Sequence, residues 1–228
     1  MANGEHIAVC RRVSRTFDVG GDVVHALAEV DFNVSAGSLV AVSGPSGSGK
    51  STLLALIGCL ARPDEGTVEL LGRDIGGLGR NARRKLRRTT AATVLAEPAE
   101  NLLLHRTGTA NIAVAARIRR TDRSPVDAMV ASVIERLAIE TFVHRTCGVM
   151  SGGEQQRVAL ACALVGHTPL LIADEPTAAL DAESAGDVIR ALRAAAHAGS
   201  AVVVATHDPN VIAAADTSVA LEHGRTVT

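Results

Sequence analysis

The chain has 228 residues, of which 47% are hydrophobic, and its 24 acidic and 23 basic residues give a formal net charge of −1. This composition excludes a disordered chain, and the balanced charge excludes a general attraction to nucleic acid or to a membrane surface. The length fits one large domain, or one domain that carries an inserted subdomain.

The first third of the chain alternates aliphatic runs with a helical pattern. Near-continuous aliphatic runs predict buried strands at Ile7–Cys10 and Leu39–Val42. Alternating patterns at Val30–Val34 and Thr67–Leu71 predict half-exposed antiparallel edge strands, and helical spacing predicts a helix over Lys50–Leu60.

A basic run follows at Arg80–Arg88, where the sequence RNARRKLRR carries six positive charges and no negative one. Such a run either binds nucleic acid or lipid headgroups, or forms the solvated face of a helix. No aromatic residue is interleaved with these cations to stack on bases, which favours the solvated helix face.

From about residue 96 to residue 147 the sequence predicts helices without strong strands, among them a helix at Val126–Leu137. The last third alternates helices and aliphatic strands, at Gly153–Val165, Leu170–Ala173, Ala182–Ala196 and Ala201–Ala205. Strand–helix alternation on both sides of a helical middle predicts one α/β core with a helical insertion.

Aromatic residues and cysteines limit what the core can contain. The chain has no Trp or Tyr and three Phe, so the core is predicted to be aliphatic. The four cysteines show no CxxC spacing, which favours buried free thiols over a disulfide framework or a metal site.

Residues 44–52 read GPSGSGKST and lie between a predicted strand and a predicted helix. The glycines let successive backbone N–H groups converge on phosphate oxygens, and the start of the helix adds the positive end of its dipole. Lys50 is predicted to reach the β- and γ-phosphates, and the Ser51 hydroxyl to ligate Mg²⁺. The ATP-binding residues predicted in this loop are Gly44, Pro45, Ser46, Gly47, Ser48, Gly49, Lys50, Ser51 and Thr52.

Two carboxylates end the aliphatic segment LLIADEP at 170–176. An acid at the carboxyl end of such a strand faces the crevice in which ligands of open α/β sheets bind. We therefore expect Asp174 to hold Mg²⁺ through water, and Glu175 to orient and deprotonate an attacking water.

Three further motifs accompany these two: SGGEQQR at 151–157, before the acidic strand end, and AALD at 178–181 and ATHD at 205–208 after it. In the order and spacing of all five motifs, and over nearly its whole length, the chain resembles the nucleotide-binding subunit of ABC transporters. The segment VHAL at 24–27 and the sequence around the phosphate loop resemble the macrolide-exporter and lipoprotein-release branch of that family.

The resemblance implies a fold and a division of the chain. The fold is a P-loop NTPase (RecA-like) α/β core with an antiparallel β subdomain and an inserted α-helical subdomain. The core with its β subdomain would comprise residues 1–95 and 151–228, and the helical subdomain residues 96–150, within a single domain of 228 residues.

The resemblance also assigns roles to single residues. It implies that Phe17 stacks on adenine, the alternative being a core Phe, and that His207 supports the charge that develops on the γ-phosphate. Asp181 is implied to lie at a junction between two subunits. A further set is implied to bind the ATP held by a second subunit: Ser151, Gly152, Gly153 and Glu154.

One position departs from the family pattern. The family carries a glutamine where the core meets the helical subdomain, and aligning VLAEPAENLL at 94–103 places Ala96 there. Alanine has no amide to ligate Mg²⁺ or to sense a permease. Glu97, one residue on, is the candidate to replace the glutamine, although a neighbouring residue on an extended chain usually faces the other way. The departure affects expectations for Mg²⁺ affinity, hydrolysis rate and coupling, but not for ATP binding.

The sequence therefore predicts an ATPase subunit that uses ATP and Mg²⁺, pairs with a second ATP-binding subunit of the same chain, and powers a separate transmembrane permease for export or extrusion. It is expected at the cytoplasmic face of the cell membrane, held there by the permease, with no nucleic-acid partner. One alternative is an ATP-dependent mechanical or regulatory partner of a membrane protein, with weak hydrolysis and no transport. Another is a nucleic-acid or ribosome-associated ABC protein, which would need tandem cassettes, a coiled-coil insertion or a basic arm.

Overall fold

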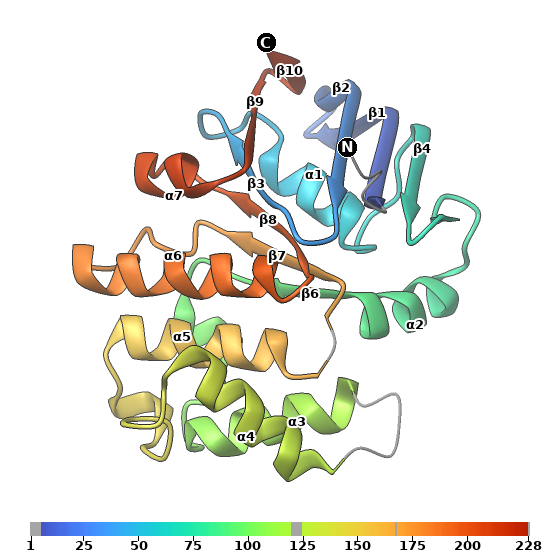
Figure 1. The fold of residues 1–228 in the computed structure, drawn as a ribbon. Coiled ribbons are helices and arrows are strands. Elements are labelled where there is room, and N and C mark those ends of the chain that lie inside the picture. Colours follow the sequence, from blue (N-terminus) through green and yellow to red (C-terminus); the bar gives the residue numbers. More distant parts are fainter. Residues whose placement is uncertain (1–5, 120–124, 167, 228) are drawn as a thin grey trace.

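A computed structural model describes residues 6–119, 125–166 and 168–227 of the chain as two sheets and a layer of helices (Figure 1). Within these residues the smaller sheet has four antiparallel strands in the order β2-β1-β4-β5. The larger sheet has the order β10-β9-β3-β8-β7-β6, in which β10 is antiparallel to its neighbour and the other pairs are parallel. The predicted α/β fold with an antiparallel β subdomain is confirmed.

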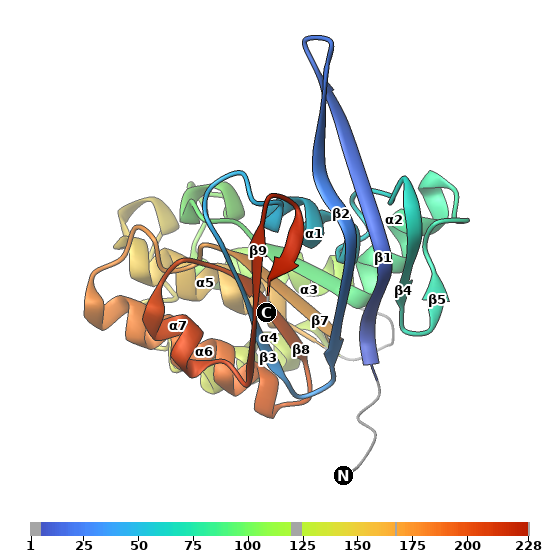
Figure 2. The ribbon, with the colours of Figure 1, turned by 90° about the horizontal axis from the view of Figure 1, so that it is seen from above.

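The smaller sheet contains β1 (His6–Val19), β2 (Asp22–Ser35), β4 (Glu65–Leu70) and β5 (Arg73–Asp74). The first two strands form a long hairpin that projects from the body of the molecule (Figure 2). The predicted strands at Ile7–Cys10 and Val30–Val34 cover only the inner parts of β1 and β2. The outer part of the hairpin is exposed and has no apolar pattern that would predict a strand.

The larger sheet contains β3 (Leu39–Ser43), β6 (Ala91–Val94), β7 (Leu170–Asp174), β8 (Ala201–Ala205), β9 (Thr217–Glu222) and β10 (Arg225–Val227). The three strands predicted here are confirmed to within one residue, since nearly every residue of β3, β7 and β8 is buried. The other three were not predicted. β6 is short and starts with two alanines, while β9 and β10 are mostly exposed or half-buried.

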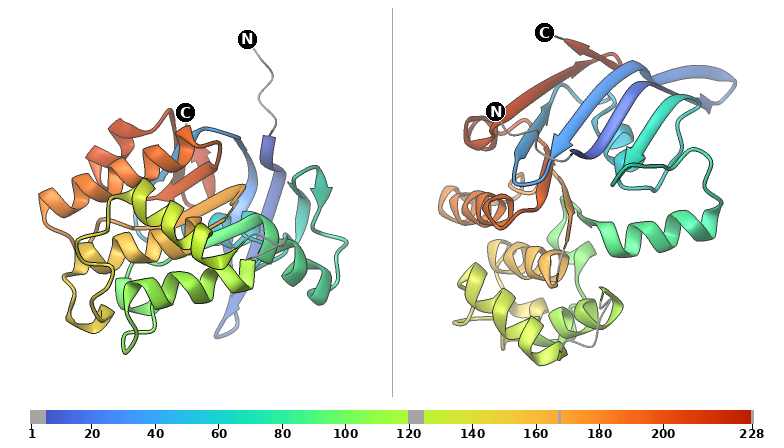
Figure 3. Two further views of the ribbon diagram at one scale, coloured as in Figure 1. Left: turned by 60° about the horizontal axis from the view of Figure 1, so that its bottom comes forward. Right: turned by 45° about the vertical axis from the view of Figure 1, so that its right-hand side comes forward.

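The helices are α1 (Lys50–Ile57), α2 (Arg80–Thr90), α3 (Gly108–Arg119), α4 (Val126–Leu137), α5 (Gly152–Leu164), α6 (Ala182–His197) and α7 (Pro209–Ala214), with 3-10 turns η1 (Pro98–Asn101) and η2 (Cys147–Val149). α6 and α5 lie side by side on one face of the larger sheet, α6 against β8 and β3 and α5 against β6, and α3 and α4 pack against α5 (Figures 1 and 3). α1 is shorter than predicted because Gly58 and Cys59 end it, the latter with a left-handed φ of 56°. The basic run forms α2, as predicted.

The core is aliphatic, as predicted, and Phe32 and Phe142 are the aromatic residues buried in it. All four cysteines are free thiols, three of them buried and Cys162 partly buried. Burial raises the pKa of Cys10 and Cys162 to about 12, so both thiols stay protonated at neutral pH.

No helix in the described part of the chain combines the length and the apolar character needed to cross a bilayer. α3 and α4 fall inside the segment predicted as a helical subdomain, residues 96–150. The division of the chain at residues 96 and 150 stays a prediction, since α5, which begins after this segment, packs directly on both helices.

Candidate functional site

The phosphate loop links β3 to α1 and is folded too tightly to accept side chains at two of its glycines. Gly44 has a φ of 141°, and a Cβ atom there would lie 2.1 Å from the backbone oxygen of Leu221. Gly49 has a φ of 104°, and a Cβ atom there would lie 2.3 Å from the oxygen of Ala26. Glycine is therefore required at both positions for the loop to curl against the strands beneath it.

Lys50, the first residue of α1, closes this loop with its side chain. Its Nζ donates hydrogen bonds to the carbonyl oxygens of Gly44 (2.7 Å) and Pro45 (2.9 Å). The ammonium group thus lies beside the N-terminus of α1, where backbone N–H groups and the helix dipole also favour an anion.

The loop forms one side of a cleft of about 610 Å³. Most of the residues predicted to bind ATP, to hold Mg²⁺ or to act in hydrolysis lie on this cleft, although they come from four separate parts of the chain. The lining residues are Phe17, Val24, Ala26, Gly44, Pro45, Ser46, Gly47, Ser48, Gly49, Lys50, Ser51, Thr52, Asp174, Glu175 and His207.

Phe17 lies on this cleft and not in the core, so the alternative of a core Phe is wrong. The residue is 42% exposed, and in the β1–β2 hairpin it is paired directly with Val24. Sequence reasoning missed Val24 and Ala26 as cleft residues, although both belong to the VHAL segment that carried part of the resemblance.

Ser51 and Asp174 meet at the floor of the cleft, where the Ser51 hydroxyl donates to Oδ2 of Asp174 at 3.0 Å. A hydroxyl and a carboxylate are the hard oxygen ligands that Mg²⁺ prefers, and Mg²⁺ takes its other ligands from water and phosphate. These two residues therefore fit Mg²⁺.

Glu175 and His207 follow the neighbouring strands β7 and β8 and contact each other. His207 Nδ1 lies 2.9 Å from Glu175 Oε1, and the His207 backbone N–H donates to Oε2 at 3.4 Å. The Glu175 backbone has a positive φ of 46°, and its N–H donates to the carbonyl of Ala205 at 2.8 Å. The strand ends thus place a carboxylate beside an imidazole, at the cleft that holds the phosphate loop.

The SGGE segment lies elsewhere, because none of its four residues lines the cleft. Ser151 caps α5 in a reciprocal pair: its backbone N–H donates to Glu154 Oε2 (2.8 Å) and its hydroxyl accepts from the Glu154 N–H (3.2 Å). Glu154 also accepts from Arg145 Nη1 at 2.8 Å. Ser151 and Gly152 are exposed, whereas Gly153 is buried, and a Cβ atom on it would lie 2.5 Å from Ser184 Oγ.

Asp181 is exposed and caps α6 by accepting hydrogen bonds from the backbone N–H (2.9 Å) and hydroxyl (2.8 Å) of Ser184. The bond from the Ser184 N–H is the main reason why the pKa of Asp181 lies below its ordinary value. Asp181 is thus an ionised cap at neutral pH and, like the SGGE segment, lies off the cleft.

Ala96 and Glu97 are both exposed, between β6 and η1, and neither lines the cleft. Asn101, which the sequence gave no reason to single out, holds this turn. It accepts from the Leu95 N–H (2.8 Å) and donates to the carbonyls of Leu95 and Glu97 (3.1 Å each). The loop at the position of the missing glutamine is therefore fixed by its own hydrogen bonds.

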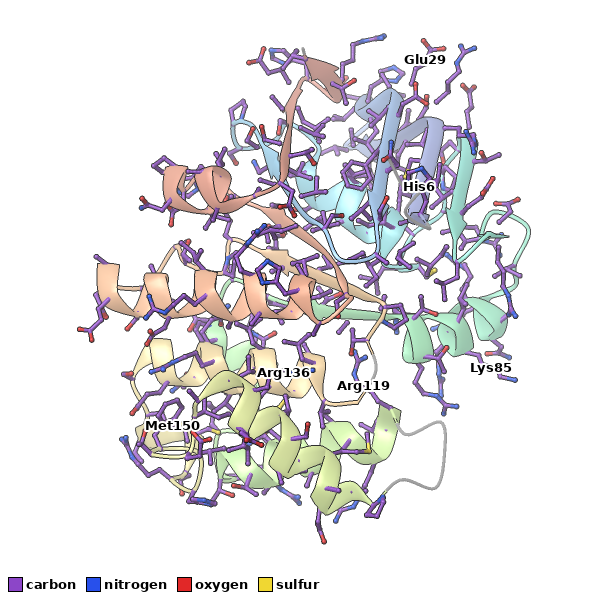
Figure 4. All side chains as sticks on the ribbon, in the orientation of Figure 1. His6, Glu29, Lys85, Arg119, Arg136 and Met150 are labelled. Carbon is purple, nitrogen blue, oxygen red and sulfur yellow. The ribbon has the colours of Figure 1, made fainter. Side chains whose placement is uncertain are left out.

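A second, larger cleft of about 1020 Å³ lies beside α2 and was not predicted. Lys85 on α2 and Arg119 at the end of α3, both labelled in Figure 4, line it together with residues of β6 and η1. In the sequence, the basic run at Arg80–Arg88 was the signal that could have pointed to this cleft. It was interpreted as a solvated helix face, and an exposed helix face does not by itself predict a cleft.

A family model described as ABC transporter matches residues 27–178. The chain is 38% identical over 217 residues to the macrolide export ATP-binding/permease protein MacB 1/2 of Paracoccus denitrificans, and 35% identical over 215 residues to MacB of Salmonella typhimurium. These matches cover 95% and 94% of this chain but 32% and 33% of those proteins, so the chain spans about a third of the length of the curated relatives that it matches.

Solved structures match the fold over almost the whole chain. The cassette MJ0796, in a dimeric post-hydrolysis state bound to ADP and Pi, is 30% identical with a TM-score of 0.86 over 97% of each chain. The cbiO1 protein of Clostridium perfringens, part of the ABC transporter complex cbiONQ, is 25% identical with a TM-score of 0.87 over 98% of this chain and 88% of that one.

Proposed function

The chain belongs to the ABC transporter family, and we propose that it is an ATPase subunit that hydrolyses ATP to power a separate membrane permease of the export or extrusion type. The observation that carries the proposal is a single cleft that contains the phosphate loop, a hydroxyl–carboxylate pair suited to Mg²⁺, and a carboxylate suited to activate water.

ATP would bind with its phosphates in the loop and its base at the hairpin. The loop N–H groups and Lys50 neutralise the β- and γ-phosphates, and the ring of Phe17 stacks on adenine. Ser51 and, through water, Asp174 would hold Mg²⁺, which supplies positive charge to the phosphate oxygens when it is bound.

Hydrolysis would use the Glu175–His207 pair. A water attacks the γ-phosphorus in line with the bond from that phosphorus to the bridging oxygen, and Glu175 takes a proton from the water. This P–O bond breaks, and ADP leaves with its electron pair. His207, which contacts Glu175 and is the more exposed of the two side chains, supports the charge on the transferring phosphoryl group.

A second ATP-binding subunit, a second copy of this chain, would complete each site. Ser151, Gly152, Gly153 and Glu154 lie off the cleft of their own chain, which supports a role at the ATP of the partner. Asp181 would lie where the two subunits meet. Because Gly153 is buried against Ser184 and Glu154 is engaged by Arg145, the exposed Ser151 and Gly152 are the members best placed to meet a phosphate.

The permease is proposed from the relatives, whose names join an ATP-binding part to a permease. The chain would then work at the cytoplasmic face of the membrane, held there through that partner. An ATP-dependent mechanical or regulatory partner of a membrane protein is the second candidate, and the observation that favours it is Ala96, where the family carries a glutamine.

Glu175→Gln tests the proposed function directly. We expect the variant to bind ATP, to lose hydrolysis by about 10²-fold or more, and to accumulate as a dimer, because the base is lost while the phosphate contacts stay. Size-exclusion chromatography with ATP and Mg²⁺, alongside a phosphate-release assay, measures both effects. A variant that stays monomeric, or that hydrolyses ATP at the wild-type rate, would show that Glu175 is not the base or that the dimer is not the active form.

A further inference from the structure

Arg15 and Phe17 stack on one another on β1. The guanidinium carbon of Arg15 lies 5.0 Å from the centroid of the Phe17 ring, within the range at which an aromatic face attracts a cation. Phe17 is 42% exposed and lines the nucleotide cleft, so its side chain reaches the cleft while Arg15 lies over one face of the ring.

Arg15 is in turn held by Asp64, in the segment between α1 and β4. Arg15 Nη1 donates to Asp64 Oδ1, while the backbone N–H (2.7 Å) and hydroxyl (2.9 Å) of Thr16 donate to Oδ2. The Asp64 N–H donates to the Ser14 carbonyl at 2.9 Å. These contacts tie the hairpin to the chain segment that leaves α1, the helix that starts at the phosphate loop.

The ion pair is partly shielded, with 28% of the Arg15 side chain and 35% of the Asp64 side chain exposed. The hydrogen bond from the Thr16 backbone N–H is the main cause that holds the pKa of Asp64 below its ordinary value, with help from the Arg15 guanidinium. Asp64 is therefore charged at neutral pH and can keep Arg15 in place whenever the protein is folded.

We propose that Arg15 and Asp64 are positioning residues for the base of the nucleotide: Asp64 fixes Arg15, and Arg15 holds the Phe17 ring in the orientation that stacks on adenine. An exposed ring on a projecting hairpin loses rotamer freedom when it stacks on a ligand, and a ring that is already held loses less. This inference rests on the ATP site of the proposed function.

The test compares a ligand that has a base with one that has none. Arg15→Met keeps the length of the side chain and removes its charge, and we expect it to raise the Kd for ADP about three- to tenfold while leaving the Kd for inorganic pyrophosphate unchanged. Asp64→Asn should act in the same direction, and Arg15→Lys, which keeps the charge, should recover part of the ADP affinity. Calorimetric titration of the full chain measures all of these values.

The matched control is Arg11→Met, on the same strand. Arg11 is 65% exposed and pairs with Glu69 at 3.8 Å, so its loss should change neither Kd. In a Phe17→Ala background, Arg15→Met should have no further effect on ADP binding, because the ring on which it acts is gone.

Several results would overturn the inference. One is an equal loss for ADP and pyrophosphate, which would indicate damage to the whole site. Another is the same loss of ADP affinity with or without Phe17, and a third is no effect of Arg15→Met on ADP. If Phe17→Ala itself leaves ADP binding intact, the stacking platform and this inference both fail, but the phosphate site stands as long as Lys50→Ala abolishes binding of both ligands.

Discussion

At the scale of single residues, the two lysines of the chain have different surroundings. Lys50 Nζ lies over the phosphate loop, bonded to two carbonyl oxygens of the loop itself, whereas Lys85 lies on α2 and lines the other cleft. Every other basic side chain apart from the histidines is an arginine. A compact ammonium at the loop suits a close approach to phosphate oxygens better than the planar guanidinium would.

Lys50→Ala is expected to reduce ATP affinity on the order of a hundredfold or more, because the phosphates lose charge-assisted hydrogen bonds that nothing else in the loop can replace. Lys85→Ala removes the other lysine and should leave ATP affinity unchanged. A direct binding assay with fluorescent ATP measures both. Wild-type affinity in Lys50→Ala would contradict the assignment of the phosphate loop.

Ala96→Gln is expected to raise ATP hydrolysis, with the largest gain at limiting Mg²⁺, because the amide would add one oxygen ligand where the family has one. ATP affinity should change little, since Ala96 does not line the nucleotide cleft. A Mg²⁺ titration of the hydrolysis rate, for the wild type and for Ala96→Gln, is the measurement.

Glu97→Ala is the companion variant. It should change the hydrolysis rate little, because Glu97 is exposed and does not line the nucleotide cleft. If Glu97→Ala is instead the damaging change, Glu97 has taken over the role of the glutamine. If neither substitution changes the hydrolysis rate, the loop that contains Ala96 and Glu97 plays no part in hydrolysis. The mechanical or regulatory candidate then gains support.

At the scale of elements, the start of β3 is held by a carboxylate that follows α7. Asp216 accepts a hydrogen bond from the Leu39 N–H (2.8 Å) and another from Arg193 Nη1 on α6 (2.6 Å). The bond from Arg193 is the main reason why the pKa of Asp216 lies below its ordinary value. One side chain thus joins β3, α6 and the entry to β9.

A carboxylate whose pKa is lowered by folding stabilises the protein at pH values above the pKa that it has in the unfolded chain. This contribution is lost as the pH falls through the pKa that it has in the folded protein. We therefore expect Asp216→Asn to lower the Tm at pH 7 by on the order of 2 °C, a modest effect because the pair is partly exposed and screened. The difference from the wild type should stay constant from pH 7 to about pH 5 and close in more acidic solution. Thermal unfolding across this range measures it, and a difference that persists at acidic pH would contradict the assignment.

The elements that the sequence predicted are those whose buried residues form a continuous apolar run in the sequence. β3, β7 and β8 are continuous aliphatic runs because both faces of the sheet are covered. β6 and β9 depend on neighbours distant in the chain, and their own sequences carry little apolar pattern. The outer half of the β1–β2 hairpin is mostly exposed, so periodicity could not reveal it.

The functional residues also divide into those that the sequence predicted and those that it did not. Lys50, Ser51, Asp174 and Glu175 were predictable because each lies in a contiguous motif with a strand on one side. The cleft beside α2 was not, because it forms where α2, the end of α3, β6 and η1 come together in three dimensions. The contacts from Asp64 through Arg15 to Phe17 were equally hidden, since Asp64 lies far along the chain from β1.

At the scale of the whole molecule, the nucleotide cleft and the SGGE segment are two separate surfaces of one chain. Neither surface alone holds all the groups proposed to act on ATP. Head-to-tail pairing of two copies would bring the cleft of each to the SGGE segment of the other, giving two composite sites for each dimer.

Mixing two inactive variants tests this arrangement. Lys50→Ala lacks a working cleft, and Ser151→Arg places a bulky cation at the exposed cap of α5. Each alone should fail to hydrolyse ATP, whereas a mixed pair contains one intact composite site, so the mixture should recover a measurable fraction of the wild-type rate. Complete inactivity at every mixing ratio would argue that the site is not shared between subunits.

The position of β3 between β8 and β9 has a consequence for protein synthesis. Translation delivers β3 and the phosphate loop well before β8 and β9, the two strands with which β3 pairs. The loop itself packs on the Leu221 carbonyl at Gly44, and the Ser48 carbonyl accepts from the Gly224 N–H at 3.1 Å. A nascent chain therefore carries an unpaired aliphatic strand until β8 and β9 have been made. We expect a chain that stops before β9 to lack the packing that shapes the phosphate loop, and so not to bind ATP.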